Sequence, residues 1–128
     1  MEMFKIGEYA IMENPTPGQR FVKSILADEQ RVVNLRGIFA LLSPGNQVPY
    51  HFHNERESII IAISGKATEI VEGEKFPVEA SDILYIPAKE KHGLVNTSDK
   101  DFRYLEFFTG GPGVVDRVDV EWPEGSVK

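Results

Sequence analysis

The sequence of 128 residues contains no cysteine and only three histidines. Without cysteine the chain has no disulfides and no thiolate ligands, so any bound metal must be held by nitrogen and oxygen atoms. No apolar run is long enough to span a bilayer, and the polar, acidic segment 1–20 lacks the hydrophobic stretch of a secretion signal. We therefore expect a cytoplasmic protein with no membrane partner.

Runs of basic residues are also absent. The formal net charge is -6, with 14 Lys and Arg against 20 Asp and Glu. Nucleic acids and anionic membrane surfaces are bound by clustered Lys and Arg, so neither is expected as a partner. The length and a hydrophobic content of 41% fit one globular domain that covers residues 1–128.

Helical periodicity is weak, and short β-rich runs alternate with Gly, Pro, Asn and Asp instead. Roughly eight to ten such runs at close spacing predict an all-β sandwich or barrel. Segment 3–12 alternates imperfectly and is predicted as a further strand. We expect the N-terminal arm 1–19 and the C-terminal tail 110–128 to cover a sheet edge or to reach a second subunit.

The stretch PYHFHNERESIII, residues 49–61, indicates a metal site. His51 and His53 share one face of a strand because residues two apart point the same way. Glu57 follows after a gap that allows a turn, and His92 is the remaining histidine in the chain. Imidazole and carboxylate are good ligands for divalent transition metals, so a site is favoured over charged residues on a solvent-exposed strand end.

Two longer motifs give the sequence a family resemblance. The first reads GNQVPYHFHNERESIIIAISG, from Gly45 to Gly65, and the second reads SDILYIPAKEKHGLVN, from Ser81 to Asn96. In spacing and order they resemble the two motifs of the cupin superfamily. There are departures: seven residues follow Glu57 where the family has about six, and Ser81 and Lys89 replace glycines at turns.

The resemblance implies a double-stranded β-helix, or jelly-roll barrel. It implies that His51, His53, Glu57 and His92 bind one divalent metal ion: Mn, Fe, Ni, Zn, Co or Cu. It also implies a small oxygen-rich substrate or ligand in the barrel, and a homodimer. Small proteins of this family include dioxygenases, decarboxylases and isomerases of sugars or sugar acids. An open metal beside few acid or base groups slightly favours a dioxygenase; a non-catalytic ligand-binding protein is the alternative.

Strand parity predicts the other residues of the pocket. Counting by twos back from His51 places Gln47 on the metal side, and counting on from Glu57 places Ile59 and Ile61 there. The strand 102–108 leaves two alternatives, in which either Tyr104 and Glu106 or the residues between them face inward. Asn96 is interpreted as a turn residue.

Overall fold

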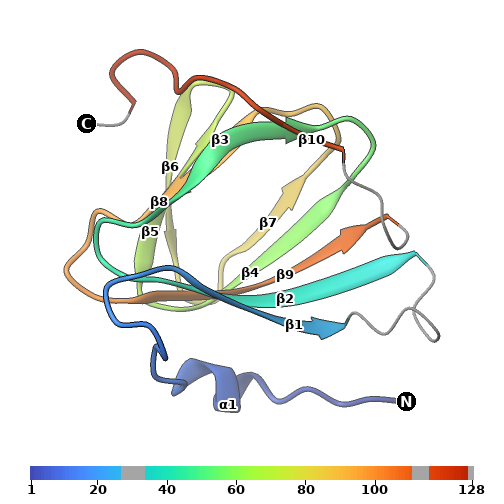
Figure 1. Cartoon of the computed structure of the whole chain (residues 1–128), viewed down its shortest axis with the longest axis vertical. Coiled ribbons are helices and arrows are strands. Elements are labelled where there is room, and N and C mark those ends of the chain that lie inside the picture. The colour runs from blue at the N-terminus through green and yellow to red at the C-terminus, as the bar shows by residue number, and fades with distance from the viewer. Residues whose placement is uncertain (27–33, 111–115, 127–128) are drawn as a thin grey trace.

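The computed structural model describes residues 1–26, 34–110 and 116–126, and it contains two five-stranded antiparallel sheets (Figure 1). Sheet A has the strand order β1-β2-β9-β4-β7, and sheet B has the order β10-β3-β8-β5-β6. The strands of sheet A are β1 (Phe21–Leu26), β2 (Leu35–Leu42), β9 (Phe102–Thr109), β4 (Ser58–Ser64) and β7 (Ile83–Ile86). Those of sheet B are β10 (Arg117–Asp119), β3 (Gln47–His53), β8 (His92–Val95), β5 (Lys66–Val71) and β6 (Glu74–Glu79). The chain crosses repeatedly between the sheets, which is the double-stranded β-helix that the resemblance implies.

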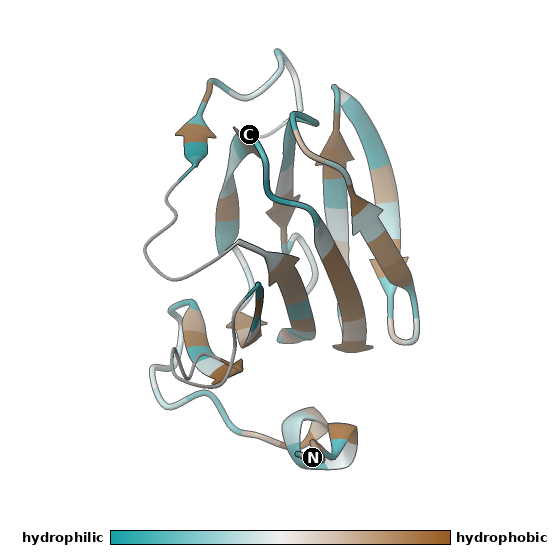
Figure 2. Cartoon of the chain, turned by 90° about the vertical axis from the view of Figure 1, so that its right-hand side faces the viewer, coloured by the Kyte–Doolittle hydropathy of each residue, from teal (hydrophilic) through white to brown (hydrophobic). Residues whose placement is uncertain are grey.

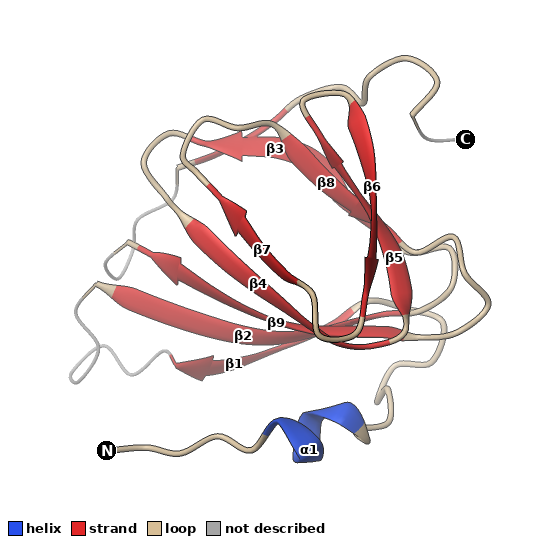
Figure 3. Cartoon of the chain, turned by 180° about the vertical axis from the view of Figure 1, so that it is seen from behind, coloured by secondary structure: helices blue, strands red, loops and turns tan. Residues whose placement is uncertain are grey.

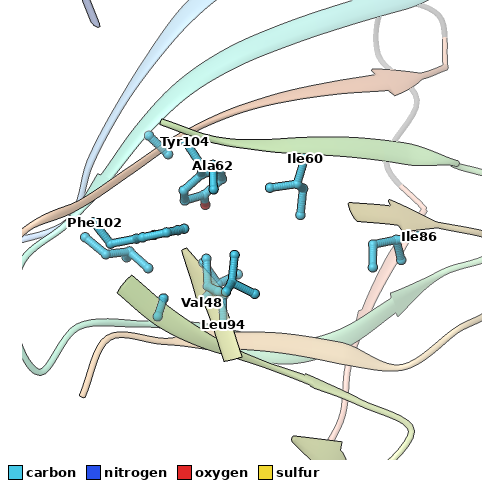
Figure 4. Close-up of a cluster of buried hydrophobic side chains, with 11 residues drawn as sticks. Val48, Ile60, Ala62, Ile86, Leu94, Phe102 and Tyr104 are labelled. Carbon is cyan, nitrogen blue, oxygen red and sulfur yellow. The ribbon is translucent and has the colours of Figure 1, made fainter. Parts of the chain in front are cut away.

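The hydrophobic core lies between the two sheets. In Figure 4, Ile60, Ala62 and Tyr104 of sheet A point towards Val48 and Leu94 of sheet B. Apolar and polar residues alternate along the strands because one face of each sheet is turned to this core. Figure 2 shows the hydrophobic segments mainly on the strands. Four residues of this core, Val48, Ile60, Leu94 and Tyr104, also line the polar cavity described below.

The outer face of sheet A is apolar and is covered by the N-terminal segment. Phe39, Leu41 and Leu105 form a second buried cluster on this face. Tyr9 and Met12 pack on it, with the ring centroids of Tyr9 and Phe39 5.2 Å apart. Within segment 3–12, which we predicted as a strand, the structure has helix α1 (Ile6–Ala10) (Figure 3). That prediction is wrong: Tyr9 and Met12, which pack on the sheet, lie three positions apart, about one helical turn, whereas residues on one face of a strand lie two apart.

The outer face of sheet B is covered by the other end of the chain. Residues 116–126, here named the C-terminal segment, include β10, which extends sheet B beside β3. Val120 and Trp122 pack on the buried cluster formed by Tyr50, Ile70 and Val95. Gly93 of β8 is required there, because a Cβ atom at this position would meet the Trp122 ring at 2.4 Å. The tail thus covers an edge of its own sheet, one of the two roles expected for it.

Two residues of the second motif, Ser81 and Lys89, stand where the family has glycine, and both keep a backbone conformation typical of glycine. Ser81 has φ 78° and Lys89 has φ 70°, both in the left-handed region. Ser81 lies between β6 and β7, where the chain crosses from sheet B to sheet A.

No helix in the described part of the chain is long and apolar enough to cross a membrane.

Candidate metal centre

Three histidines from two neighbouring strands converge inside the barrel. His51 and His53 lie on β3, and His92 is the direct cross-strand partner of His51 on β8. One ring nitrogen from each lies within 4.8 Å of the others. The three residues are 5%, 6% and 5% exposed. The H-x-H spacing on a strand and the pairing of β3 with β8 together produce this cluster.

Each of the three imidazoles is oriented through its Nδ1 atom. His51 Nδ1 donates to the carbonyl oxygen of Pro49 at 2.6 Å. His53 Nδ1 lies 2.8 Å from Asp116 Oδ1, and His92 Nδ1 lies 2.7 Å from Glu69 Oε1. Since these partners are acceptors, the Nδ1 atoms carry the protons and the Nε2 lone pairs are left for a ligand.

Burial in the pocket favours the neutral form of two of the histidines, His51 and His53. Burial lowers the pKa of His51 to about 3 and also lowers the pKa of His53. Burial acts to raise the pKa of Asp116, but the hydrogen bonds that it accepts from Glu55 N–H, the His53 ring and Arg56 N–H outweigh this and lower it. A neutral imidazole is the form that binds a metal, so the site is prepared for one at neutral pH.

One observation of the structure supports the binding of a divalent transition metal by these histidines. His92 Nε2 is buried and has no hydrogen-bond partner among the described residues. A buried polar atom without a partner carries a free-energy cost, and a metal ion would remove it. Three convergent nitrogen donors with carboxylate or carbonyl partners behind them are the arrangement expected of such a centre.

The structure corrects the fourth ligand that we predicted from the sequence. Glu57 does not belong to the histidine cluster; its carboxylate accepts a hydrogen bond from the Tyr85 hydroxyl group at the protein surface. The neighbouring Ser58 is 3% exposed and pairs with Ile86 of β7. Ser58 also satisfies both spacings of the first motif, with four residues after His53 and six before Gly65. The seven-residue gap after Glu57 was the signal for this shift.

The same one-residue shift changes the predicted pocket floor. Ile60 and Ala62 belong to the core between the sheets, whereas Ile59 is 45% exposed and Ile61 packs with the outer cluster of sheet A. Gln47 is exposed at the start of β3. The predicted parity of Ile59 and Ile61 is wrong because it is counted from Glu57 as though that residue faced inward. Gln47 is counted back from His51, and its parity is wrong because the register of β3 against β8 shifts between Val48 and His51.

A cavity of about 160 Å³ lies between the histidines and sheet A. Tyr104 and Glu106 of β9 both line it, as the first of the two alternatives for this strand predicted. Burial raises the pKa of Tyr104, so its hydroxyl group remains protonated. Asn96 does not line the cavity; its side-chain amide donates to the Leu42 and Lys100 carbonyl groups, as expected of a turn residue.

Several residues that contact the histidines or line the cavity were missed in the sequence. Glu69 is an acidic residue in the interior of an apolar strand, and that position alone was a usable signal for a buried partner. Asp116 is 63 residues away from His53, so no local pattern connects them. Arg56 enters the cavity and pairs with Glu106 at 2.8 Å, a contact that depends on how β4 and β9 are placed.

The comparisons with known proteins agree with this architecture. The family model described as Cupin domain matches residues 38–108, and the chain belongs to this family. It is 30% identical over 66 residues, 52% of this chain and 43% of the relative, to a protein of Streptomyces cyaneus named polyketide synthase CurC. It is 30% identical over 69 residues, 50% of this chain and 36% of the relative, to a glucose-6-phosphate isomerase of Pyrococcus abyssi. The aligned region thus spans less than half of each relative.

A solved structure shares the fold over nearly the whole chain. The polyketide cyclase RemF of Streptomyces resistomycificus superimposes with a TM-score of 0.73 and 19% identity, covering 97% of this chain and 88% of that protein. At this identity the likeness concerns the fold alone. The family and the geometry together establish a cupin barrel in which His51, His53 and His92 are positioned for a metal ion.

Proposed function

We propose that the protein is a metal-dependent enzyme that moves a proton on a small, oxygen-rich molecule bound in the barrel. His51, His53 and His92 would hold one divalent ion through Nε2. When bound, that ion would supply Lewis-acid polarisation of a ligand oxygen. The observation that carries the proposal is the shared cavity, which has the three histidines on one side and Tyr104 and Glu106 on the other.

The residues of sheet A supply the proton chemistry in this proposal. Glu106 presents a carboxylate that can accept a proton from a ligand, and Tyr104 keeps a hydroxyl proton that it can donate to a ligand oxygen. Arg20 lines the same cavity, and its guanidinium group acts to lower the pKa of Tyr104 against the larger effect of burial. These groups suit isomerisation, decarboxylation or ring closure, each of which passes through an enolate-like state next to a carbonyl.

The slight preference for a dioxygenase rested on a pocket with few acid or base groups. The carboxylate of Glu106 and the hydroxyl of Tyr104 in the cavity support proton transfer instead. The named relatives support the same direction, since an isomerase and a polyketide cyclase are among them. The cavity holds roughly five waters at liquid density, so we infer a substrate of only a few non-hydrogen atoms in the site itself.

The test begins with elemental analysis of the purified protein and then uses a panel of 2-oxo acids, enediols and catechols. In D₂O, NMR should show metal-dependent deuterium exchange at a carbon next to a carbonyl, with no oxygen uptake at an electrode. Oxygen consumption in step with product would establish the dioxygenase. Thermal stabilisation by a ligand without exchange or product would establish a binding protein.

The expected homodimer is also part of this proposal. Ile59, Ile83 and Tyr85 are exposed side by side on β4 and β7 at the edge of sheet A, and Ile59 pairs with Tyr85 across the strands. A second copy would cover this apolar surface. Light scattering after size-exclusion chromatography measures the mass directly, and charged substitutions at Ile83 should lower it from twice 14.4 kDa to the monomer value.

A further inference from the structure

Arg56 occupies a position in the cavity that a purely structural arginine would not need. It lies in the short connection between β3 and β4, three residues after His53, and its side chain lines the same cavity as the histidines. Its guanidinium group stacks on the Phe108 ring, with Cζ 3.5 Å from the ring centroid. Stacking fixes the plane of the guanidinium and leaves its edge free for in-plane hydrogen bonds.

One edge of this guanidinium contacts a carboxylate within the protein. Arg56 Nη2 lies 2.8 Å from Glu106 Oε2, and Nε lies 3.4 Å from Ser58 Oγ. The Arg56 and Glu106 side chains are 21% and 11% exposed, so the pair faces the cavity and is not sealed in the core. The contact uses a single nitrogen, whereas a carboxylate that approached in the guanidinium plane would accept two hydrogen bonds.

The charge of the cavity favours an anionic ligand. Its described lining residues include three arginines, at positions 20, 56 and 117, and two glutamates, at positions 69 and 106. A divalent cation held by the three histidines would increase this positive excess. Arg117 is already paired with Asp119 at 2.7 Å, and the charge of Arg20 acts on the Tyr104 hydroxyl group. Among these three arginines, Arg56 is thus the one that is paired with a carboxylate of the cavity lining.

We propose that Arg56 anchors the carboxylate of the substrate, which replaces Glu106 on the guanidinium. The class of ligand is a small monocarboxylate with an oxygen on the adjacent carbon, that is, a 2-oxo or 2-hydroxy acid. Such a molecule reaches Arg56 with its carboxylate and the histidine centre with its second oxygen. The exchange releases the Glu106 carboxylate beside the ligand. This inference rests on the proposed function, because it names the substrate class of that site.

The experiment compares two probes that differ in charge and little in shape. Pyruvate and its neutral methyl ester are titrated into the protein by NMR, once with Zn²⁺ and once after treatment with a chelator. Wild type, Arg56→Gln, Arg56→Lys and Glu106→Gln are compared. Arg117→Gln is the matched control, since it removes a cavity arginine that has its own partner. Melting temperature and zinc content are measured for each variant to show that the fold and the histidine centre are intact.

We expect Arg56→Gln to weaken pyruvate binding at least tenfold and to leave the affinity for methyl pyruvate unchanged. Arg56→Lys keeps the charge but loses the planar fork, so its pyruvate affinity should fall between those of wild type and Arg56→Gln. Glu106→Gln should bind pyruvate more tightly than wild type because the competing carboxylate is gone. Arg117→Gln should weaken pyruvate binding less than threefold.

Equal weakening of both probes by Arg56→Gln, or weaker pyruvate binding in Glu106→Gln, would overturn the anchor, since a structural ion pair would behave in this way. The titration without metal separates the two proposals. If the protein takes up no metal, the proposed function fails, while the charge-dependent contribution of Arg56 is still read from the metal-free titration.

Discussion

The two walls of the cavity are built differently. On the sheet B side, the three histidines are almost fully buried, and each ring is held by a partner of its own: a carbonyl group, Asp116 or Glu69. On the opposite side, the polar groups pair with one another and are partly exposed, as the Arg56 and Glu106 side chains are. The first wall is fixed before any ligand arrives, and the second contains contacts that a ligand can replace.

This difference shows how one barrel separates two tasks. A metal centre needs donor atoms held in place, and hydrogen bonds from behind accomplish this without using the coordinating atoms. Substrate binding needs groups that change partner, so they are better placed on the opposite wall. The C-terminal segment contributes to the fixed wall from outside, since Asp116 contacts His53 while Trp122 packs behind β3 and β8.

The largest effect should come from breaking the fixed wall itself. His51→Ala removes one of three converging nitrogen donors while leaving the buried Glu69–His92 pair intact, and it should abolish stoichiometric metal binding. Elemental analysis and calorimetric titration with Zn²⁺ measure this. Glu57→Gln is the control, because Glu57 contacts Tyr85 away from the histidines, and its metal content should equal that of wild type. Metal loss in Glu57→Gln would restore the four-ligand site predicted from the sequence.

A smaller effect on metal binding should follow when a histidine ring loses its hydrogen-bond partner but remains in the site. Asp116→Asn removes the carboxylate behind His53 and should lower zinc affinity by about 10- to 100-fold. Asp119→Asn is the matched control on the same strand, since Asp119 is exposed and pairs with Arg117. A competition titration with a zinc-binding dye gives both affinities. Equal values for the two variants would mean that Asp116 does not support the centre.

The burial of His51 predicts that the stability of the metal-free protein depends on pH. The pKa of His51 is about 3 in the folded chain and near 6.5 when unfolded, so protons bind preferentially to the unfolded state between these values. The free energy of unfolding should therefore fall as the pH drops below 6.5, by about 1 kcal/mol from His51 between pH 7 and pH 5.5. Urea denaturation in the presence of chelator measures the free energy of unfolding at each pH. The His51→Ala variant should lack the contribution of His51 to this pH dependence. A flat profile would contradict a dry, neutral His51.

The smallest effect concerns a turn that joins the two walls. Ser81 adopts a left-handed backbone between β6 and β7, and its N–H donates to the Ala62 carbonyl group. Ser81→Gly removes the steric cost of that conformation and should stabilise the protein by about 0.5 kcal/mol after the entropy of glycine is counted. Thermal denaturation checks this, with Ser81→Ala as the control that keeps Cβ. A gain in Ser81→Ala as large as in Ser81→Gly would exclude the backbone explanation.

Much of the fold followed from local patterns. Alternation and turn residues predict an all-β barrel because each sheet turns one face to a common core. The exceptions have local causes: Tyr9 and Met12, which cover sheet A, lie three positions apart, and the inward face of β4 begins at Ser58 and not at Glu57. A one-residue error in parity moves every later side chain of a strand to the other face.

The site was only partly accessible from the sequence. His51 and His53 are identified by their spacing, and His92 follows because the chain has just one more histidine. The groups that orient them are different, since Asp116 reaches His53 through the pairing of β10 with β3, a contact set by tertiary structure. The contact between Arg56 and Glu106 likewise depends on the placement of β4 beside β9.

The most direct test of the account is an anomalous diffraction map from crystals grown with Zn²⁺. We predict one peak inside the barrel, bonded to Nε2 of His51, His53 and His92, with Glu57 still at the surface beside Tyr85. A map with no peak between the three rings, or with the Glu57 carboxylate bonded to the ion, would contradict it.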